Sequence, residues 1–410
     1  MKLWLKILIA MVLGVIVGSI LGPDAKYLKP IGTMFLNAIN MIIVLLVFSS
    51  MTLGITSIHD PKKLGRVGLR TLLLYLGTTI IATIIGISFG TFFQPGDGLG
   101  LQAVKAVDLS NAPDISSILL TVIPSNPVAA LAQGNVIQII VFSIFLGLAI
   151  NFAGPKGKPL LAVIESLADV MYRLTSIVMA FSPIGVFALM AWVAGSFGVA
   201  VFLPLLKFVL TLYGASLVHV GVVFCGILWF MARLNPIPFF KGMKDAMVMA
   251  FSTCSSAATL PVAMHCVQEN LGVSKNISGF VLPLGITINM NGTAIYQAMS
   301  AVFIAQVYGI SLDITMLVTI SLAATLSAIG TAGIPGSGFI MLSVVLASVG
   351  LPLEGLAIMI GVERLREMVA TTMNILGDAV VTVYVAKKEG ELDERKYYHT
   401  EIVEFKPEDA

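Results

Sequence analysis

The sequence predicts an all-α polytopic membrane protein with eight transmembrane helices and two re-entrant helical hairpins. Of its 410 residues, 57% are hydrophobic and only 11% are charged, whereas a soluble globular domain carries about 25% charged residues. The apolar residues form runs about 20 residues long, the length of helix that crosses roughly 30 Å of hydrocarbon. Two runs in the C-terminal half are interrupted by turn-forming residues. These observations exclude a water-soluble domain, and a net charge of +2 gives no electrostatic footprint for nucleic acid.

Six apolar runs come first along the chain and predict six helical spans. The first run follows Lys2 and Lys6 as in a signal peptide, but no small-x-small cleavage motif precedes the turn at Gly22 and Pro23. We therefore expect it to remain as a true span. The six runs lie at residues 3–22, 31–58, 68–93, 127–152, 159–196 and 201–232.

Basic residues predict the orientation of these spans, because loops rich in Lys and Arg stay in the cytoplasm. The ends assigned to the cytoplasm carry Lys2, Lys6, Lys62, Lys63, Arg66, Arg70, Lys156, Lys158, Arg233, Lys241 and Lys244. The opposite loops are poor in charge or mixed, so we expect a cell-membrane protein with both termini in the cytoplasm. Of the 46 charged residues, 13 lie in residues 387–410. We expect residues 390–410 to form a solvated, partly disordered tail, with a docking segment as the alternative.

Two interruptions mark the long apolar stretch that follows the sixth span. One covers residues 252–261 and is rich in Ser and Thr, and the other covers residues 329–338 and is rich in Gly. Irregular backbone at membrane depth is tolerated only where it is buried in protein or lines a cavity. Each interruption is therefore predicted to be the tip of a re-entrant hairpin, and each is followed by a span with polar residues. Paired broken segments of this kind indicate a transporter binding site.

The last span carries a stripe of polar residues. At about 100° per residue, Glu363, Thr371, Asn374 and Asp378 all fall within about 40° of Glu367 on the helix surface. An ionised side chain at mid-membrane costs a few kcal/mol or more, so it should face a cavity or a partner. The glutamates have arginine neighbours with which they could simply pair, whereas Asp378 has none nearby. The stripe predicts a site for a cation, an ammonium group or both.

The preceding polar span has a second cluster around Gly292. Asn289, Asn291 and Thr293 alternate about this glycine, which predicts local unwinding that frees backbone carbonyls. Freed carbonyls with Asn and Asp oxygens are ligands for hard cations such as sodium. The alternative is a cluster of interhelical hydrogen bonds.

Four motifs in this order resemble the dicarboxylate/amino acid:cation symporter family, which includes archaeal aspartate transporters and mammalian glutamate and neutral amino acid transporters. They are Ser-Ser-Ala-Ala-Thr-Leu-Pro at 255–261, Leu-Pro-Leu-Gly at 282–285 with Asn-Met-Asn-Gly-Thr at 289–293, Gly-Thr-Ala-Gly-Ile-Pro-Gly at 330–336, and Asn-Ile-Leu-Gly-Asp at 374–378. The resemblance runs from the first span to about Glu389. It implies a homotrimer in the lipid bilayer, inverted repeats and an elevator mechanism with the second hairpin as gate. It also implies scaffold helices at 1–66 and 97–198, a transport domain at 67–96 and 199–389, and a cytoplasmic tail at 390–410.

The resemblance also implies the site residues. An amino acid substrate would be bound by Ser256, Thr293, Ile334, Gly338, Glu367, Ala370, Thr371 and Asn374, with Glu367 holding the ammonium group. One sodium site would use Asp378, Asn374, Asn289 and the Gly285 carbonyl, and a second would use Met290, Thr287 and Thr331. A third would use Tyr75, Thr78 and Thr79 with Asn289 and Asn291. No cofactor is implied beyond these coupling ions.

One departure from the family pattern concerns the substrate. Members that take acidic substrates carry an Arg at the position of Ala370, which holds the side-chain carboxylate in a bidentate pair. Other members carry a positive charge at the positions of Cys254 or Met368. A carboxylate left without partners would cost a few kcal/mol, so the sequence predicts a preference for neutral amino acids. The alternative is an acidic amino acid or dicarboxylate held by Arg366 or Arg364.

Two further departures concern the coupling ions. Asn291 stands where the family usually has Asp, which removes a carboxylate from the third cation site and predicts fewer coupled sodium ions. Glu363 and Glu367 stand where Asp is usual, and one extra methylene moves each carboxylate inward by about 1.5 Å. A closely placed acid pair can share a proton, so proton coupling is an alternative to sodium.

Other classes of protein fit the sequence less well. An anion channel also uses broken helices but needs no ammonium-binding acid beside two hairpin tips. An intramembrane enzyme would pair Ser255 or Ser256 with His265, but no third group orients them, so we expect no enzyme activity. The three cysteines are scattered in apolar runs and predict neither a disulfide framework nor a zinc site.

Overall fold

The computed structural model describes residues 3–56, 67–98, 123–134, 136–197, 202–329, 331, 333 and 336–398. These residues are helical or lie in turns and short connections, apart from one isolated antiparallel bridge between Val273 and Leu392. The prediction of an all-α protein is confirmed. Some predicted features lie outside the described residues: the gate residue Ile334, the basic loop with Lys62, Lys63 and Arg66, and the tail from residue 399 onward.

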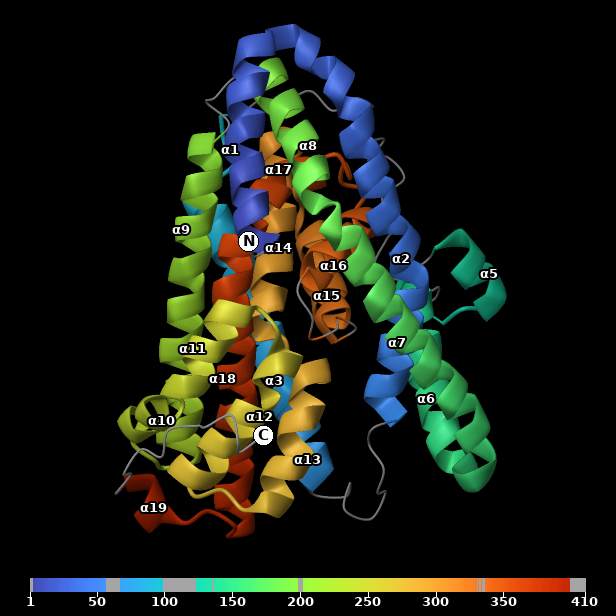
Figure 1. Cartoon of the computed structure of the whole chain (residues 1–410). Helices are drawn as coiled ribbons and strands as arrows, with labels where there is room; N and C mark the ends of the chain where they lie inside the picture. Colours follow the sequence, from blue (N-terminus) through green and yellow to red (C-terminus); the bar gives the residue numbers. More distant parts are fainter. Residues whose placement is uncertain are drawn as a thin grey trace.

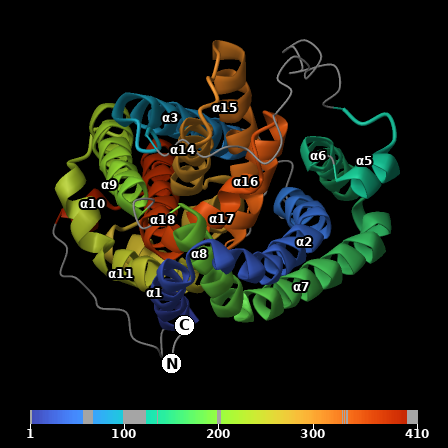
Figure 2. The ribbon, with the colours of Figure 1, turned by 90° about the horizontal axis from the view of Figure 1, so that it is seen from above.

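The N-terminal helices pack through small residues. Helices α1 (Leu3–Leu21) and α2 (Lys29–Thr56) are joined by the 3₁₀ turn Gly22–Leu28. A Cβ atom built on Gly18 would lie only 2.1 Å from the carbonyl oxygen of Ala191 in α8, so the two backbones meet directly. Small residues commonly allow this close approach between membrane helices. Helices α2, α5 (Pro127–Gln133), α6 (Val136–Ala153) and α7 (Lys158–Ala180) lie on one side of the molecule, away from α18 (Glu363–Glu389) (Figures 1 and 2).

Two predicted spans are each divided into two helices, which corrects the single spans expected at 127–152 and 159–196. They are α5 (Pro127–Gln133), α6 (Val136–Ala153), α7 (Lys158–Ala180) and α8 (Ser182–Phe197). Gly134 ends α5 with a φ of 68°, in the left-handed region that glycine adopts without steric cost. Pro183 lies at the start of α8, because proline cannot donate the hydrogen bond that would continue α7.

Helix α18 lies at the centre of the C-terminal half. The elements of this half include α9 (Phe202–His219), α10 (Pro236–Gly242), α11 (Lys244–Thr253), α13 (Lys275–Ile288), α14 (Asn291–Val307), α17 (Gly355–Met359) and α18 (Glu363–Glu389). The earlier helix α3 (Leu69–Phe93) packs against α14 and α18. Helix α9 continues through two π-helical turns, Val220–Phe224 and Ile227–Met231. Seen from above in Figure 2, α18 lies among α9, α11 and α14, all of which contact it.

Both predicted interruptions are breaks between paired helices. The first separates α11 (Lys244–Thr253) from α12 (Ser256–His265), and the second separates α15 (Ile314–Ile329) from α16 (Ser337–Ser348). The helices of each pair contact each other. Neither α12 nor α16 is long enough to span a bilayer alone, which agrees with a pair of re-entrant hairpins.

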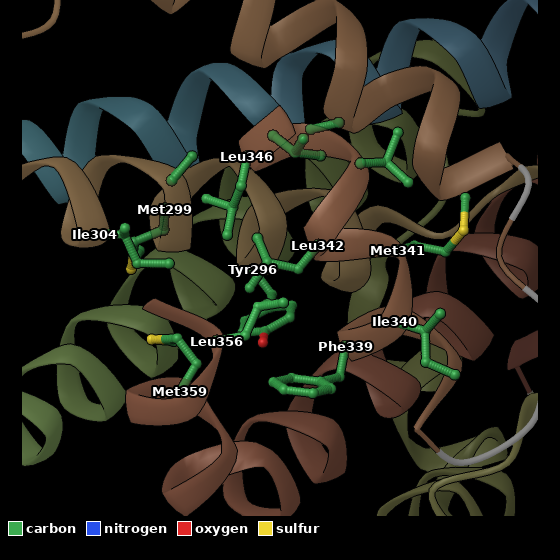
Figure 3. Packing of buried hydrophobic residues seen from close by; sticks show 14 of the residues in the cluster. Tyr296, Met299, Ile304, Phe339, Ile340, Met341, Leu342, Leu346, Leu356 and Met359 are labelled. Atoms are coloured by element: carbon green, nitrogen blue, oxygen red, sulfur yellow. The ribbon is translucent and has the colours of Figure 1, made fainter. Parts of the chain in front are cut away.

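A buried apolar cluster fixes α14 against the second pair. Tyr296 of α14, Phe339 and Leu342 of α16, and Leu356 and Met359 of α17 all belong to it (Figure 3). The cluster holds α16 beside the N-terminal end of α18, where the polar stripe begins.

Long apolar helices agree with a multi-pass membrane protein. Among the described residues, the stretches Ile9–Phe35, Leu69–Phe93, Leu203–Met231 and Gly355–Glu389 are long and apolar enough to cross a membrane. Shorter apolar helices lie at Val44–Leu53, Pro183–Gly195, Ile314–Ile329 and Ser337–Ser348. The orientation of the termini stays a prediction.

The first part of the C-terminal tail is folded onto the bundle, which corrects the expectation that the whole tail is solvated. We call residues 390–398, which include α19 (Glu394–Tyr398), the C-terminal strap. The Asp393 amide donates to the Gly272 carbonyl at 2.8 Å, and the fully buried Tyr397 donates its hydroxyl to the Asn235 carbonyl at 2.9 Å. Lys396 pairs with Glu269 at 2.9 Å and lowers the pKa of that carboxyl. This pair stabilises the folded strap above the ordinary pKa of Glu269, and its small contribution is lost as the pH falls through the lowered pKa.

Replacing Tyr397 by alanine is expected to release the strap. The substitution removes a buried aromatic ring and one hydrogen bond, which together contribute about 3 kcal/mol. Trypsin cleavage after Arg395 or Lys396 should therefore become about 100-fold faster. Tyr398→Ala is the matched control, since Tyr398 is 45% exposed and should change the rate by less than about tenfold. Equal cleavage of the two variants would contradict a docked strap.

Candidate functional site

The tips of the two interrupted pairs touch each other. Cys254 ends α11 in the left-handed region with a φ of 55°, and Ser255 then caps α12 by accepting from the Ala258 amide at 3.2 Å. From the second tip, the Gly333 carbonyl accepts from the Ser255 hydroxyl at 3.0 Å and from the Ala257 amide at 3.1 Å. The two breaks, far apart in sequence, therefore form one structure beside α18.

A small cavity lies between these tips, α14 and α18. Its lining includes the predicted substrate residues Ser256, Thr293, Gly338, Glu367, Ala370, Thr371 and Asn374, and the predicted cation residues Met290 and Thr331. It also includes Cys254, Gly333, Ser337 and Arg366. The structure thus brings the predicted substrate residues that it describes around one cavity, while their role in binding stays a prediction.

Glu367 links α18 to the second tip. Its Oε1 accepts from the Gly336 amide at 2.5 Å, and Gly336 has a φ of 84°, which favours glycine. Arg364 and Arg366 each place a guanidinium nitrogen 3.9 Å from a Glu367 oxygen. Arg364 also donates to the Ser252 carbonyl at 2.9 Å. The carboxylate expected to hold an ammonium group is therefore held firmly at the cavity wall.

Arg366 is buried at the cavity wall, with only 1% of its surface exposed. Its Nε donates to Glu363 Oε2 at 2.9 Å, and its Nη2 donates to Glu363 Oε1. Its Cζ lies 4.1 Å from the centre of the Tyr296 ring, a cation–π contact. No hydrogen bond from Nη1 is found within the described part of the chain. This leaves the N–H groups of Nη1 as donors for a ligand.

Helices α14 and α18 meet at backbone distance beside the cavity. A Cβ atom built on Gly292 would lie 2.4 Å from the Ala370 carbonyl oxygen. Asn374 bridges the same contact, since its Oδ1 accepts from the Gly292 amide at 2.8 Å and its Nδ2 donates to Thr293 Oγ1 at 3.3 Å. Asn374 therefore holds the first turn of α14 against α18, and the predicted unwinding is confined to Asn289 and Met290, just before Gly292.

Asp378 lies below this contact and is completely buried. Its Oδ1 accepts from Asn289 Nδ2 at 2.9 Å, whereas its Oδ2 has no hydrogen-bond partner among the described residues. The ion pairs found in the described chain do not include Asp378. An unpaired buried charge costs several kcal/mol, and a bound cation would offset this cost. The unpartnered oxygen of Asp378 therefore fits a cation ligand.

Further oxygen donors surround Asn289 and Asn291. The Thr78 hydroxyl lies 3.3 Å from Asn289 Oδ1 and the Thr79 hydroxyl 3.0 Å from Asn291 Oδ1, and both hydroxyls also lie within hydrogen-bond distance of the Tyr75 carbonyl. The Tyr75 hydroxyl donates to the Val281 carbonyl at 2.9 Å. The predicted third cation set is therefore brought together, and its hydroxyl and amide oxygens are ligands that hard cations accept.

Gly285 and Thr287, the remaining predicted cation residues, make hydrogen bonds in or next to their own helix. A Cβ atom built on Gly285 would meet Asp378 Oδ1 at 2.4 Å, so the two residues touch, but the Gly285 carbonyl accepts from the Asn289 amide at 2.7 Å. The Thr287 hydroxyl donates to the Leu284 carbonyl within its own helix at 3.0 Å. Thr287 does not line the cavity that holds Met290 and Thr331.

The sequence predicted Arg366 only as an alternative ligand for a carboxylate, and it gave no indication that Tyr296 lies beside the site. Arg364 and Arg366 are the only basic residues between Lys275 and Lys387. A basic residue inside an apolar membrane stretch is itself a signal of function. No comparable signal marked Tyr296, which lies on another helix about 70 residues earlier.

Comparison with known proteins gives consistent matches over almost the whole chain. Residues 3–388 match the family model described as "Sodium:dicarboxylate symporter family". The "Proton/sodium-glutamate symport protein" of Geobacillus stearothermophilus is 36% identical over 406 residues, 95% of both chains. The "Proton/glutamate-aspartate symporter" of Escherichia coli is 36% identical over 95% of this chain and 94% of its own. The "C4-dicarboxylate transport protein" of Bacillus subtilis is 34% identical over 96% of this chain and 95% of its own.

Proposed function

Because the chain belongs to the sodium:dicarboxylate symporter family, we propose that it is a cation-coupled symporter that takes up acidic amino acids. The family consists of transport proteins, which agrees with the expectation that this chain is not an enzyme. Glu367 would hold the substrate ammonium group, and Arg366 would bind the side-chain carboxylate. The buried guanidinium at the cavity wall, with Nη1 free of hydrogen bonds to the described residues, is the observation that carries the proposal.

This proposal replaces the preference for neutral amino acids that the sequence favoured. The similar proteins are named for glutamate, aspartate and C4-dicarboxylates, which supports the alternative with Arg366. The preference for neutral amino acids rested on the absence of Arg at Ala370, but a long side chain can reach the same cavity from a different position on the helix. A charge-assisted pair with a guanidinium is about twice as strong as a neutral hydrogen bond, so Arg366 can replace an Arg at 370.

An amino acid suits the cavity better than a plain dicarboxylate. Glu363 already neutralises part of the Arg366 charge, and the Glu367 carboxylate adds a negative charge to the cavity lining. A C4-dicarboxylate would bring two negative charges and no ammonium group to Glu367. An acidic amino acid offers an ammonium group to Glu367 and a carboxylate to Arg366.

Asp378 and the oxygen donors around Asn289 support cation coupling. We infer that sodium binds there, with protons as the alternative ion, because the similar proteins are named for both. This proposal also includes three features that the family resemblance implied. They are the division into scaffold and transport domains, the elevator motion with the second hairpin as gate, and the homotrimer.

The proposal is tested by uptake into liposomes with separate sodium and proton gradients. We expect saturable glutamate or aspartate uptake driven by an inward sodium gradient, with each acidic amino acid competing at least about tenfold better than alanine, serine or glutamine. Uptake that persists in choline and follows a pH gradient would assign the proton as coupling ion. Stronger competition by succinate or alanine would overturn the substrate assignment, and non-saturating flux would indicate a channel.

A further inference from the structure

The position of the Arg366 guanidinium depends on groups that do not themselves contact the substrate in the proposed function. Glu363 occupies Nε and Nη2, and the Tyr296 ring lies 4.1 Å from Cζ. The Tyr296 hydroxyl donates to Glu363 Oε2 at 3.4 Å, so the two residues that contact the guanidinium also contact each other. These contacts fix the plane of the guanidinium and direct Nη1 away from Glu363.

Gly338 of α16 leaves room for that guanidinium. A Cβ atom built on Gly338 would lie 2.9 Å from Arg366 Nη1, 3.3 Å from Nη2 and 3.1 Å from Thr293 Cγ2. Gly338 lies within α16 and its φ is outside the left-handed region. The backbone therefore does not require glycine at this position. The requirement is steric, since real Cβ atoms essentially never come within 3.0 Å of another heavy atom.

The guanidinium cannot easily move away from an added methyl group. The end of an arginine side chain is usually flexible, but here Glu363 and Tyr296 hold it on two sides. The Gly338 carbonyl also accepts from Gln297 Nε2 at 3.3 Å, which ties α16 to α14. A side chain at 338 would therefore push Nη1 out of its place in the cavity wall.

We propose that Tyr296, a positioning residue outside the cavity lining, and Gly338, which lines the cavity, together set the selectivity for a substrate carboxylate. Tyr296, with Glu363, holds the guanidinium so that Nη1 faces the substrate, and Gly338 keeps the space for it. Neither residue supplies the charge. The inference rests on the proposed role of Arg366 and goes beyond it by assigning selectivity to residues on two other helices.

The test measures the KM for glutamate and for glutamine, its uncharged isostere, in proteoliposomes. Gly338→Ala is expected to raise the glutamate KM about tenfold while changing the glutamine KM less than about threefold. Tyr296→Leu should do the same, whereas Tyr296→Phe keeps the ring and should lose no more than about threefold. Gly355→Ala is the matched control, since its Cβ would press on the Ile304 side chain at 2.7 Å away from the cavity. It should leave the glutamate-to-glutamine KM ratio unchanged.

The outcomes separate this inference from the proposed function. If Arg366→Leu leaves the KM ratio unchanged, the proposed function itself is wrong. If Arg366→Leu lowers glutamate selectivity but Gly338→Ala and Tyr296→Leu do not, only the positioning role is overturned. A variant that raises both KM values equally also overturns it, because a general distortion of α16 would act on both substrates. If Gly338→Ala does not fold, Tyr296→Leu decides.

Discussion

Replacing Arg366 by leucine is expected to raise the KM for glutamate about 100-fold and to leave uptake of glutamine within about threefold. The reason is that a carboxylate in this cavity would lose a charge-assisted contact that contributes about 3 kcal/mol. Glutamine carries no charge there and can find other donors among the Ser and Thr hydroxyls that line the cavity. The measurement is initial uptake into proteoliposomes as a function of each substrate.

The control must allow for the buried Glu363. Arg366→Leu leaves the Glu363 carboxylate, only 7% exposed, without its guanidinium partner, and breaking a buried pair can cost about 3–5 kcal/mol of stability. The double variant E363Q/R366L removes both charges and should fold better while remaining poor in glutamate uptake. Adding Ala370→Arg to the double variant should restore glutamate selectivity, because the charge returns to the same cavity. Unchanged glutamate KM in both Leu variants would contradict the role of Arg366.

Most of the helices could be predicted from hydrophobicity, since burial in lipid dominates the free energy of each span. The breaks were harder to predict. The interruptions near residues 252–261 and 329–338 contain dense clusters of turn-forming residues, whereas a lone glycine at 134 and a lone proline at 183 divide two other spans. Single residues of these types are also tolerated inside membrane helices, so the sequence alone does not decide.

The site residues could be predicted where they share one helix. They were harder to predict where a long side chain such as that of Arg366 extends away from its own helical position. The stripe from Glu363 to Asp378 follows from helical periodicity. Its middle residues line the cavity, whereas Glu363 pairs with Arg366 behind the cavity wall and Asp378 lies beside Asn289. Periodicity gives the direction of a Cβ atom, not where the end of an arginine lies. The place of Arg366 is set by Tyr296 and Gly338, which are distant in sequence. The same holds for Tyr397, whose charged neighbours suggest a solvated tail although its ring is buried.

Replacing Asp378 by asparagine is expected to reduce cation-driven uptake more than 100-fold. The substitution keeps the size of the side chain and one acceptor oxygen but removes the only charge that the described residues place beside Asn289. At an effective dielectric constant near 20, a unit charge about 4 Å from a cation contributes about 4 kcal/mol, more than a factor of 100 in affinity. The measurement is the sodium concentration that gives half-maximal glutamate uptake.

The unfolding temperature provides a second readout, because the effect of D378N is expected to differ between sodium-free buffer and buffer with sodium. In sodium-free buffer, D378N should unfold at a higher temperature than the unmodified protein, because the substitution removes a buried charge that has no cationic partner in the described chain. In sodium, the unmodified protein should gain stability through ion binding and D378N should gain little. Asn291→Asp is the contrasting variant, since it adds a carboxylate beside Thr79 and should increase the sodium cooperativity of uptake. If D378N kept the sodium dependence of the unmodified protein, the buried carboxylate would be a structural group and the coupling ion would bind elsewhere, with the cavity-lining pair Met290 and Thr331 as the next place to look.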